Sequence, residues 1–291
     1  MHPNINFIIV NYRNFKDSID CIKSILKACE YKMLGLSINV IDNNSGNRSI
    51  ENIAMEFKDT VNVNFQSFKT ESLNLYKSEK NLGFGEANNT IIKEIQSGNV
   101  FLINPDIVIE KDLLSELVKC TIKKNTIYGF PTYNYYHQNQ LLFFGGYQIN
   151  KITGRVKPNL NLQKKVDYIN GSGFLAHHSV FKATCFDNQY FLYWEDADFC
   201  LKSQAEMQVL KNCILFDKIS TTIGKGFVSE YYYQRNKLLF FKKNYPQKVI
   251  LVMIFLFPAI ILRIIRGRKE HVSALIKGFL DYSNGRVGKM V

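Results

Sequence analysis

The sequence contains no CxxC pair, although it has six cysteines among its 291 residues. None of them stands at a short spacing from a histidine, which a cysteine-based zinc site would require. A chain of this length also does not need a disulfide framework in order to fold. We therefore expect the cysteines to be small, buried side chains in a reducing compartment. They are Cys21, Cys29, Cys120, Cys185, Cys200 and Cys213.

Histidines with metal-ligand spacing are absent as well, since the five in the chain are scattered. His177 and His178 are adjacent, and on a strand they would point to opposite faces, so both could not bind one metal from there. We interpret all five as structural. The others are His2, His137 and His271.

The first residues of the sequence also lack the pattern of a secretory leader. The first residues, Met1 to Asn4, carry neither a charged region nor a long apolar run, so we expect no signal peptide and a catalytic body in the cytoplasm. There is no internal repeat and no low-complexity linker. With 46% apolar and 21% charged residues, the composition excludes a disordered or collagen-like chain.

The positive charge of the chain is concentrated at one end. The formal net charge is +12, yet the residues up to Gln234 contribute only +2 and those from Arg235 onward contribute +10. The chain thus consists of a nearly neutral body and a strongly basic tail. The cations of the tail flank an apolar stretch and do not alternate with aromatic residues, so we expect no nucleic-acid partner.

Strand and helix patterns alternate over the first 125 residues, which predicts an α/β fold with a mostly parallel sheet covered by helices. Ligands of such sheets bind at the carboxyl ends of the strands. Polar clusters at Asn11, Asp42 and Asp106 follow strand-like runs, and we expect them to meet at one rim. The predicted strands are 5–10, 36–41, 61–65, 73–76 and 100–103; the predicted helices are 15–29, 49–58, 86–96 and 112–123, with a turn at 81–85.

The middle of the chain has a different pattern. Residues 128–165 are rich in Tyr, Asn, Gln and Gly, which indicates irregular strands and loops. Helical order is expected to resume only near Glu195, where an acidic first turn favours a helix start.

Two short acidic motifs at predicted strand ends have two interpretations each. Asp42, followed by Asn-Asn-Ser-Gly, fits an Asx turn as well as a ligand position. Asn104-Pro105-Asp106 fits a turn, or a carboxylate ligand for Mg²⁺ or Mn²⁺, ions that need few protein carboxylates when substrate phosphates complete the shell. Gly83-Phe84-Gly85 lacks the third glycine of a dinucleotide fingerprint and carries little weight alone.

A third acidic motif, Glu195-Asp196-Ala197-Asp198, follows an aromatic run. Three carboxylates this close would repel one another if all were buried. The motif is therefore either a solvated helix start or the site of a general base whose pKa is raised by its surroundings. Asn170 to Phe174 reads as a glycine-containing turn to which a substrate could come close.

These motifs, taken in order, resemble the bacterial family 2 glycosyltransferases, in particular the rhamnosyltransferase-like enzymes of O-antigen and capsule assembly. The resemblance runs from Ile5 to about Asn236. The matching motifs are Val10-Asn11-Tyr12, Asp42-Asn43-Asn44-Ser45, Asn81 to Asn89, Ile103-Asn104-Pro105-Asp106, Gly171 to Phe174, and Phe191 to Lys202.

The resemblance implies a GT-A fold, a nucleotide-diphosphate sugar donor, a divalent metal and an inverting transfer. Asp42 would contact the nucleotide base, and Asn11, Asn81, Gly83 and Asn104 would line the same pocket. Asp106 would bind Mg²⁺ or Mn²⁺.

In the acidic motif, the resemblance makes Asp196 the catalytic base, with Glu195 and Asp198 beside it. Arg235 would bind phosphate in the family's closing segment. One departure concerns Thr221, which stands where many relatives have a metal-reaching His, and Thr is a poor metal ligand.

The basic tail holds 14 successive non-polar residues, Val249 to Leu262, between clusters of Lys and Arg. A spanning helix needs about 20 apolar residues, so we expect an interfacial or shallowly inserted helix on an anionic membrane surface. A buried core helix is the alternative. We predict a glycosyltransferase domain over 1–236, with halves 1–125 and 126–236, and a membrane-associating segment over 237–291.

The predicted protein is an inverting glycosyltransferase on the cytoplasmic face of the inner membrane, which extends a polyprenyl-diphosphate-linked glycan with a sugar such as rhamnose. A non-catalytic, membrane-bound sugar-nucleotide binder is the alternative, because of Thr221. A nucleotidyltransferase would normally have a Gly-rich basic phosphate loop near its N-terminus, and Asn11 to Asn14 does not resemble one.

Overall fold

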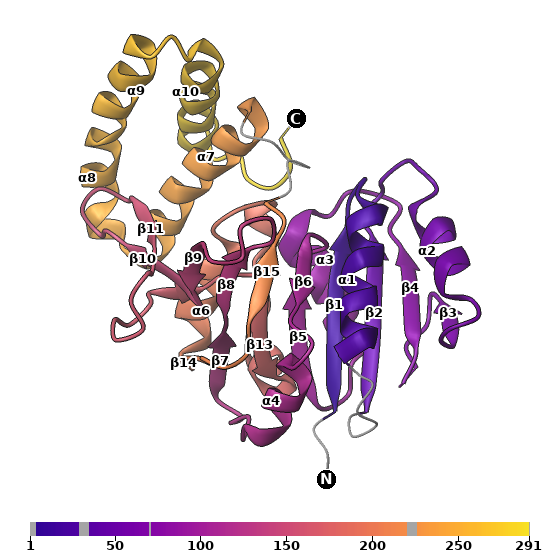
Figure 1. Ribbon diagram of the computed structural model, residues 1–291. Helices are drawn as coiled ribbons and strands as arrows, with labels where there is room; N and C mark the ends of the chain where they lie inside the picture. Colours follow the sequence, from indigo (N-terminus) through magenta and orange to yellow (C-terminus); the bar gives the residue numbers. More distant parts are fainter. Residues whose placement is uncertain (1–3, 29–34, 70, 220–225, 291) are drawn as a thin grey trace.

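The computed structural model describes residues 4–28, 35–69, 71–219 and 226–290. Its centre is an eight-stranded sheet with the order β14-β7-β13-β5-β1-β2-β4-β3, whose strands lie side by side across the view in Figure 1. The strands are β1 (Ile5–Asn11), β2 (Leu36–Asp42), β3 (Val63–Phe65), β4 (Leu73–Lys77), β5 (Asn99–Ile103), β7 (Thr126–Gly129), β13 (Gly173–His177) and β14 (Glu206–Val209).

All neighbouring strands of this sheet are parallel except β13, which pairs antiparallel with both β5 and β7. The predicted α/β class is therefore confirmed, with a mixed sheet. The covering helices are α1 (Phe15–Ala28), α2 (Ser49–Phe57), α3 (Gly83–Ile92), α4 (Leu113–Lys119), α5 (His178–Ala183) and α6 (Glu195–Ser203).

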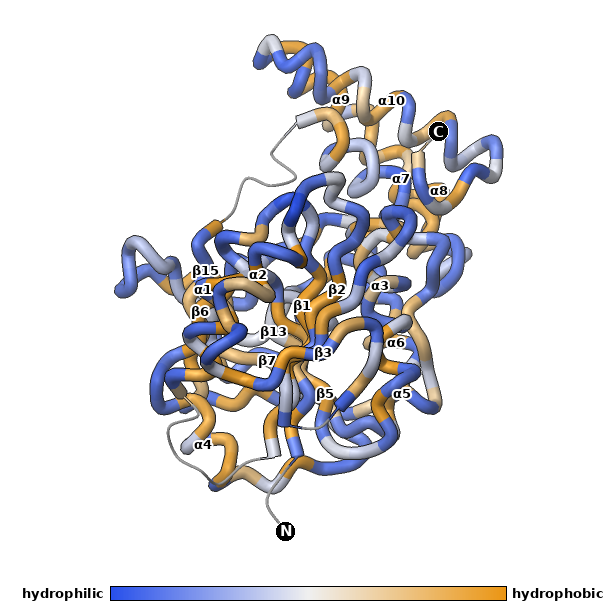
Figure 2. Tube along the Cα trace, turned by 90° about the vertical axis from the view of Figure 1, so that its right-hand side faces the viewer, coloured by the Kyte–Doolittle hydropathy of each residue, from blue (hydrophilic) through white to orange (hydrophobic). Residues whose placement is uncertain are grey.

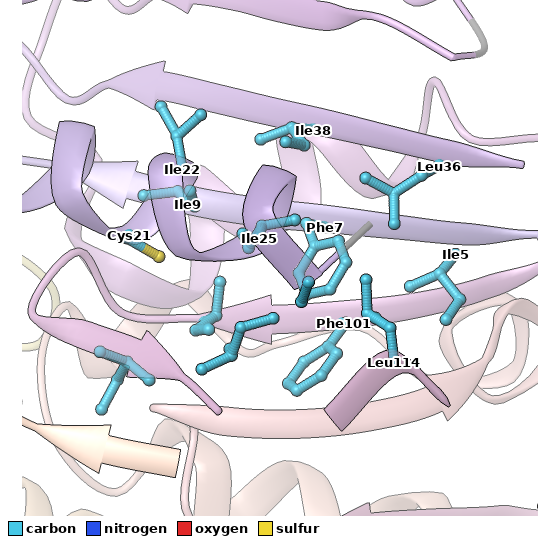
Figure 3. Packing of buried hydrophobic residues seen from close by; sticks show 14 of the residues in the cluster. Ile5, Phe7, Ile9, Cys21, Ile22, Ile25, Leu36, Ile38, Phe101 and Leu114 are labelled. Carbon is cyan, nitrogen blue, oxygen red and sulfur yellow. The ribbon is translucent and has the colours of Figure 1, made fainter. Parts of the chain in front are cut away.

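The main core lies between the sheet and helices α1, α2 and α4. Phe7 of β1 stacks on Phe101 of β5, with ring centroids 4.9 Å apart, and Ile22 of α1 is fully buried on the same side (Figure 3). β1 and β2 are almost entirely buried, as parallel strands covered on both faces must be. Figure 2 shows both in the orange of hydrophobic residues.

The middle of the chain forms two small sheets, in agreement with the prediction of irregular strands there. One has the order β6-β15-β8-β9 and the other β11-β10-β12. Their strands are β6 (Ile107–Ile109), β8 (Pro131–Asn134), β9 (Leu141–Phe144), β10 (Gly146–Ile149), β11 (Val156–Pro158), β12 (Tyr168–Ile169) and β15 (Leu215–Asp217).

Three helix predictions were wrong in their limits. The helix expected at Glu86 begins at Gly83, because the side chain of Asn81 accepts the Gly83 N–H at 3.0 Å and starts the first turn earlier. α4 ends at Lys119, since Cys120 is already extended. Helix α5 precedes Glu195, and its first turn is capped by His177, whose Nδ1 accepts the Ser179 N–H at 3.2 Å.

Four helices follow the body and lie together at one end of the molecule (Figure 1). Helix α10 packs mainly along α7. The boundary predicted between residues 236 and 237 falls inside α7, so this helix belongs to both predicted units. The four are α7 (Phe227–Asn244), α8 (Val249–Ile254), α9 (Leu256–Ile265) and α10 (Lys269–Ser283).

The apolar run of the tail is mostly exposed. Pro246–Ile265, 20 residues with a mean hydropathy of 2.6, is the one helical stretch of the described residues long and apolar enough to cross a membrane, and only 11% of its most apolar window is buried. The alternative of a buried core helix is therefore wrong. The stretch is also longer than the 14 residues counted in the sequence, because the helix extends beyond the apolar run at both ends.

Candidate functional site

The carboxyl ends of β1 and β2 bring Asn11 and Asp42 together. They are register partners at the last position of their strands, and the Asn11 amide donates to Asp42 Oδ1 at 2.8 Å. Both are buried. Asp42 also accepts from the backbone N–H of Ser45 at 3.2 Å and from its hydroxyl. The two residues predicted to line a nucleotide pocket are thus neighbours in a fixed network.

Asn43 joins this network to the start of α3, and sequence reasoning assigned it no role of its own. Its side-chain amide donates to Asn81 Oδ1 at 3.1 Å and to the Gly83 carbonyl at 2.9 Å. Its Oδ1 accepts the Leu82 N–H at 2.8 Å. The polar side chain directly after a strand was the signal available in the sequence, but its partners lie about 40 residues away. Asn43 therefore holds the predicted donor-binding residues Asn81 and Gly83 beside Asp42.

Gly83 lies against the backbone that leads to the acidic motif. It has φ +78°, and a Cβ on it would lie 2.1 Å from the Phe191 carbonyl oxygen. That same carbonyl accepts the Phe84 N–H at 2.9 Å. Only glycine permits both this conformation and this approach. The start of α3 and the loop before α6 are consequently locked together.

Asp196 lies in the first turn of α6, beside the turn at Gly171. Its Oδ2 accepts the Gly171 N–H at 3.1 Å, and its Oδ1 accepts the Ala197 N–H at 2.8 Å. Burial raises its pKa to about 6, against the effect of these two hydrogen bonds. A Cβ on Gly171 would meet the Phe84 ring at 2.9 Å. Three motifs far apart in sequence therefore meet at this carboxylate.

The other two carboxylates of the motif have different surroundings. Glu195 is buried and its Oε2 has no hydrogen-bond partner among the described residues; burial and the charge of Asp196 raise its pKa well above the ordinary value. Asp198 is fully buried and bonds Lys202 at 2.6 Å, Tyr190 at 3.1 Å and Asn244 at 2.8 Å. Asp198 thus anchors α6 to its neighbours and does not line the site.

The loop before α6 is strained. Phe191, Tyr193 and Trp194 all have positive φ, at 32°, 65° and 75°, a region costly for bulky residues. The side-chain amide of Asn236 on α7 donates to the carbonyls of Leu192 at 2.7 Å, Tyr193 at 3.2 Å and Tyr190 at 3.4 Å. Asn236 therefore holds the loop that presents Asp196. Sequence reasoning did not give Asn236 this role, because nothing local links it to residue 192.

The turn after β5 carries the predicted metal ligand. Ile103 of β5 pairs with Gly173, and the Asn104 N–H donates to the Ser172 carbonyl at 3.3 Å, so Asn104 and Asp106 lie at the rim shared with Gly171.

A second carboxylate, Asp217, lies close to Asp106. The Lys218 N–H donates to the Asp106 carbonyl at 3.0 Å, and burial together with the charge of Asp106 raises the pKa of Asp217 to about 6. No three His, Cys, Asp or Glu side chains of the described ranges converge as a complete metal site. Two carboxylates nevertheless fit Mg²⁺ or Mn²⁺ if donor phosphates complete the shell. Thr221 lies outside the described residues.

Arg235, predicted to bind phosphate, is 1% exposed. Its guanidinium lies 5.3 Å from the ring centroid of Tyr231 and 5.1 Å from that of Tyr232, and its Nη2 has no hydrogen-bond partner in the described part of the chain. Tyr232 in turn stacks on Phe191, with centroids 5.0 Å apart. In this structure Arg235 is enclosed by the side chains next to the aromatic loop: its Nε donates to Asn236 Oδ1 at 2.9 Å and its Nη1 to the Tyr231 hydroxyl at 3.3 Å.

A pocket of about 440 Å³ opens next to the turn predicted to bind the donor, between Asn81, Phe191 and residues 287–289. Residues 287–289 are held in place by two hydrogen bonds. The Gly288 N–H donates to the Gln189 carbonyl at 2.7 Å, and the Met290 N–H donates to the Tyr232 hydroxyl, also at 2.7 Å.

A mostly parallel sheet with this topology, and with carboxylates and glycine turns at one rim, is a GT-A fold. The model of Glycosyl transferase family 2 matches residues 7–184, and the chain belongs to this family.

A hexosyltransferase of low-salt glycan biosynthesis from Haloferax volcanii, Agl10, is 24% identical over 316 residues, which cover 99% of this chain and 94% of the relative. Among solved structures, residues 1–349 of S. aureus TarS are 15% identical with a TM-score of 0.56, and the match covers 87% of this chain and 70% of that one.

TarS 1–349 is also known in complex with UDP-GlcNAc, with a TM-score of 0.54 to this chain. The mannosyltransferase PcManGT from Pyrobaculum calidifontis, in complex with GDP-Man and Mn²⁺, is 10% identical with a TM-score of 0.58, over 97% of this chain and 87% of that one. At such identities these structures establish the GT-A fold alone. The chain is a family 2 glycosyltransferase, and the predicted fold, enzyme class and family are confirmed.

Proposed function

We propose that this glycosyltransferase transfers a sugar, with inversion, from a nucleotide-diphosphate donor to a lipid-linked surface-polysaccharide acceptor, and that Asp196 is its general base. The observation that carries the proposal is the position of Asp196, held by the backbone N–H groups of Gly171 and Ala197 with a pKa raised to about 6. A base of this pKa is ionised at neutral pH and still accepts a proton readily.

In the proposed reaction the acceptor hydroxyl oxygen attacks C1 of the sugar. The new C1–O bond forms as the bond from C1 to the diphosphate oxygen breaks, and the nucleoside diphosphate leaves with the bonding electrons. Asp196 takes the proton of the hydroxyl on the face opposite the leaving group, which is what inversion requires.

The donor would bind at the rim formed by Asn11, Asp42 and the Asn81–Gly83 turn. The complexes of the similar structures with UDP-GlcNAc and with GDP-Man support a nucleotide-sugar donor, and rhamnose remains our specific proposal for the sugar. Asp106, with Asp217 beside it, would hold Mg²⁺ or Mn²⁺, which supplies positive charge to the diphosphate.

A donor screen tests this function. We expect one class of nucleotide sugar to raise the melting temperature of the purified chain, because a ligand that binds only the folded state stabilises it, and the rise should be larger with Mn²⁺ than with EDTA. The same donor should yield transfer to a lipid-linked acceptor. Binding without transfer or donor hydrolysis across all donors and acceptors would instead favour a non-catalytic binder.

We further propose that the tail docks on the cytoplasmic face of the inner membrane. The apolar side chains of α8 and α9 at positions 250, 254, 257, 261 and 265 are each 55% to 75% exposed. Their spacing of three and four residues puts them on one helix face. Lys248 precedes this face, and Arg266, Arg268 and Lys269 follow it. Such an arrangement fits a helix that lies in the interface of an anionic bilayer.

Replacing Phe257 by Asp should release the protein from vesicles. The side chain is 69% exposed, and transferring a Phe side chain into an apolar phase contributes about 1.5–3 kcal/mol, so we expect vesicle affinity to fall at least tenfold in a sedimentation assay. Met55→Asp on α2 is the matched control, because Met55 is 64% exposed on the body. Equal affinities of the two variants would contradict the docking face.

A further inference from the structure

A long groove runs between the end of α9 and the outer side of α10. Its volume is about 730 Å³. Its apolar lining includes Ile264, Ile276 and Leu280, which are 60%, 43% and 51% exposed. In the described part of the chain, these side chains are left facing solvent over much of their surface. The groove borders the exposed apolar face of α9, because Ile264 lies one turn after Ile261 and next to Ile265 on that helix.

Three cations border the apolar lining. They are Lys269, Lys277 and Arg286. Lys277 and Arg286 share one buried carboxylate, Asp281, at 3.0 Å and 3.1 Å. Lys269 makes no ion pair with any described carboxylate. The groove therefore has an excess positive charge of two, beside a surface suited to hydrocarbon.

The backbone fixes the cations at both ends of α10. After α10, Gly285 has φ +71° and the Arg286 N–H donates to the Asp281 carbonyl at 2.8 Å, which is the Schellman arrangement of a helix end. After α9, Gly267 has φ +66° and the Arg268 N–H donates to the Arg263 carbonyl at 2.9 Å, the same arrangement. Lys269 directly follows that turn, so neither Lys269 nor Arg286 stands on a loosely held segment.

We propose that this groove binds one anionic phospholipid of the bilayer, with its phosphate on Lys277 and Arg286 near the C-terminal end of α10 and its acyl chain along Leu280, Ile276 and Ile264. The inference rests on the membrane docking proposed above and deepens it, since it assigns a defined lipid site beside the general docking face. Charge and apolar lining together select the ligand: inorganic phosphate would satisfy only the cations, and a zwitterionic lipid would leave the excess charge uncompensated.

The site can be tested on the full chain with a short-chain lipid that stays monomeric in solution. Dihexanoyl phosphatidylglycerol should bind saturably with one site per chain in calorimetry, and more tightly than either dihexanoyl phosphatidylcholine or inorganic phosphate. Lys277→Gln and Arg286→Gln should each weaken binding about fivefold, as expected for the loss of one cation near a lipid phosphate, whereas Lys269→Gln, at the far end of α10, should leave binding unchanged. Ile276→Ser should weaken binding of the lipid but not that of inorganic phosphate.

Lys182→Gln on α5 is the matched control, because it removes the same charge from an exposed position of the body. If Arg286→Gln and Lys182→Gln bind the lipid equally, or if phosphatidylcholine binds as well as phosphatidylglycerol, the proposal is overturned. If the wild-type chain binds vesicles but shows no saturable binding of the short-chain lipid, the lipid site in the groove is overturned, while the docking face on α8 and α9 is unaffected. A dimer in light scattering that dissociates with Leu280→Asp would also overturn it, since a second copy would then cover the groove.

Discussion

Replacing Asp196 by Asn should lower kcat about 10³-fold, within the range of 10² to 10⁴ that a positioned general base contributes. The amide keeps the shape of the side chain and one acceptor oxygen, which can serve one of the two N–H groups of Gly171 and Ala197, but it cannot accept a proton. The affinity for the donor should change little, because the proposed donor rim at Asn11 and Asp42 lies on other elements. Single-turnover kinetics with a saturating donor measure the effect.

The pH profile of the wild-type enzyme gives a second readout of the same assignment. Burial raises the pKa of Asp196 to about 6, and a base acts only when it is deprotonated. We therefore expect kcat/KM to be constant above pH 7 and to fall about tenfold per pH unit well below pH 6. A profile that is flat down to pH 4.5 would contradict the assignment of Asp196 as the base.

Asp198→Asn is the control for both experiments. This carboxylate also lies in α6, yet it bonds Tyr190, Asn244 and Lys202. Its loss should cost about 2 kcal/mol of unfolding free energy, as for a hydrogen bond to a charged group, while the folded enzyme keeps most of its kcat. If Asp198→Asn loses kcat as Asp196→Asn does at full folding, Asp198 contributes to the chemistry and our separation of the two carboxylates is wrong.

Asn236→Ala should lower kcat at least tenfold, although we assign Asn236 no contact with a substrate. The variant removes a donor shared by the carbonyls of Tyr190, Leu192 and Tyr193, so the positive-φ conformations of the loop lose the interaction that holds them. Asp196 would then sample positions away from the acceptor, and small displacements of a catalytic group are costly. We expect a fall in kcat with a smaller change in the KM of the donor.

Asn6→Ala is matched to this variant, because the buried amide of Asn6 also donates to two carbonyls, those of Ser97 and Asn99, each at 3.2 Å. Asn6 lies at the opposite end of β1 from Asn11. Both variants should lose about 1–3 kcal/mol of stability through unpaired carbonyls, but only Asn236→Ala should lose kcat when both are measured well below their melting temperatures. Equal kcat values would reduce Asn236 to a structural role.

Much of the rim could be predicted from the sequence, because the carboxyl ends of parallel strands meet at one edge. That rule brings Asn11, Asp42 and Asp106 together from their positions after apolar runs, and the pairing of Asn11 with Asp42 bears it out. The rule does not predict the hydrogen bonds of Asn43 or Asn236, because their partners include backbone groups about 40 residues away. Backbone carbonyls have no sequence signature, so their partners become visible only in the fold.

From the sequence alone, the roles of the three carboxylates of α6 could be distinguished only in part. Residues two apart on a helix point in widely different directions, so Asp196 and Asp198 could not both face one cleft. Which of the two faces the site depends on the neighbours of the helix, namely Gly171 on one side and Asn244 on the other. The early start of α3 was missed because glycines usually indicate turns. In this fold Gly83 is required by the close approach of the Phe191 backbone, and a Cβ on Gly85 would meet the side chain of Phe186 at 2.8 Å.

Helix α7 holds the loop before α6 through Asn236 and also packs against α10 of the tail. This has a practical consequence. The family match ends at residue 184, which excludes both Asp196 and Asn236. A fragment cut at that limit, or before Phe227, would therefore be an incomplete folding unit, whatever its solubility. A soluble form of the enzyme is better obtained by polar substitutions at Ile250, Ile254 and Phe257, which are exposed, with every residue of α7 retained.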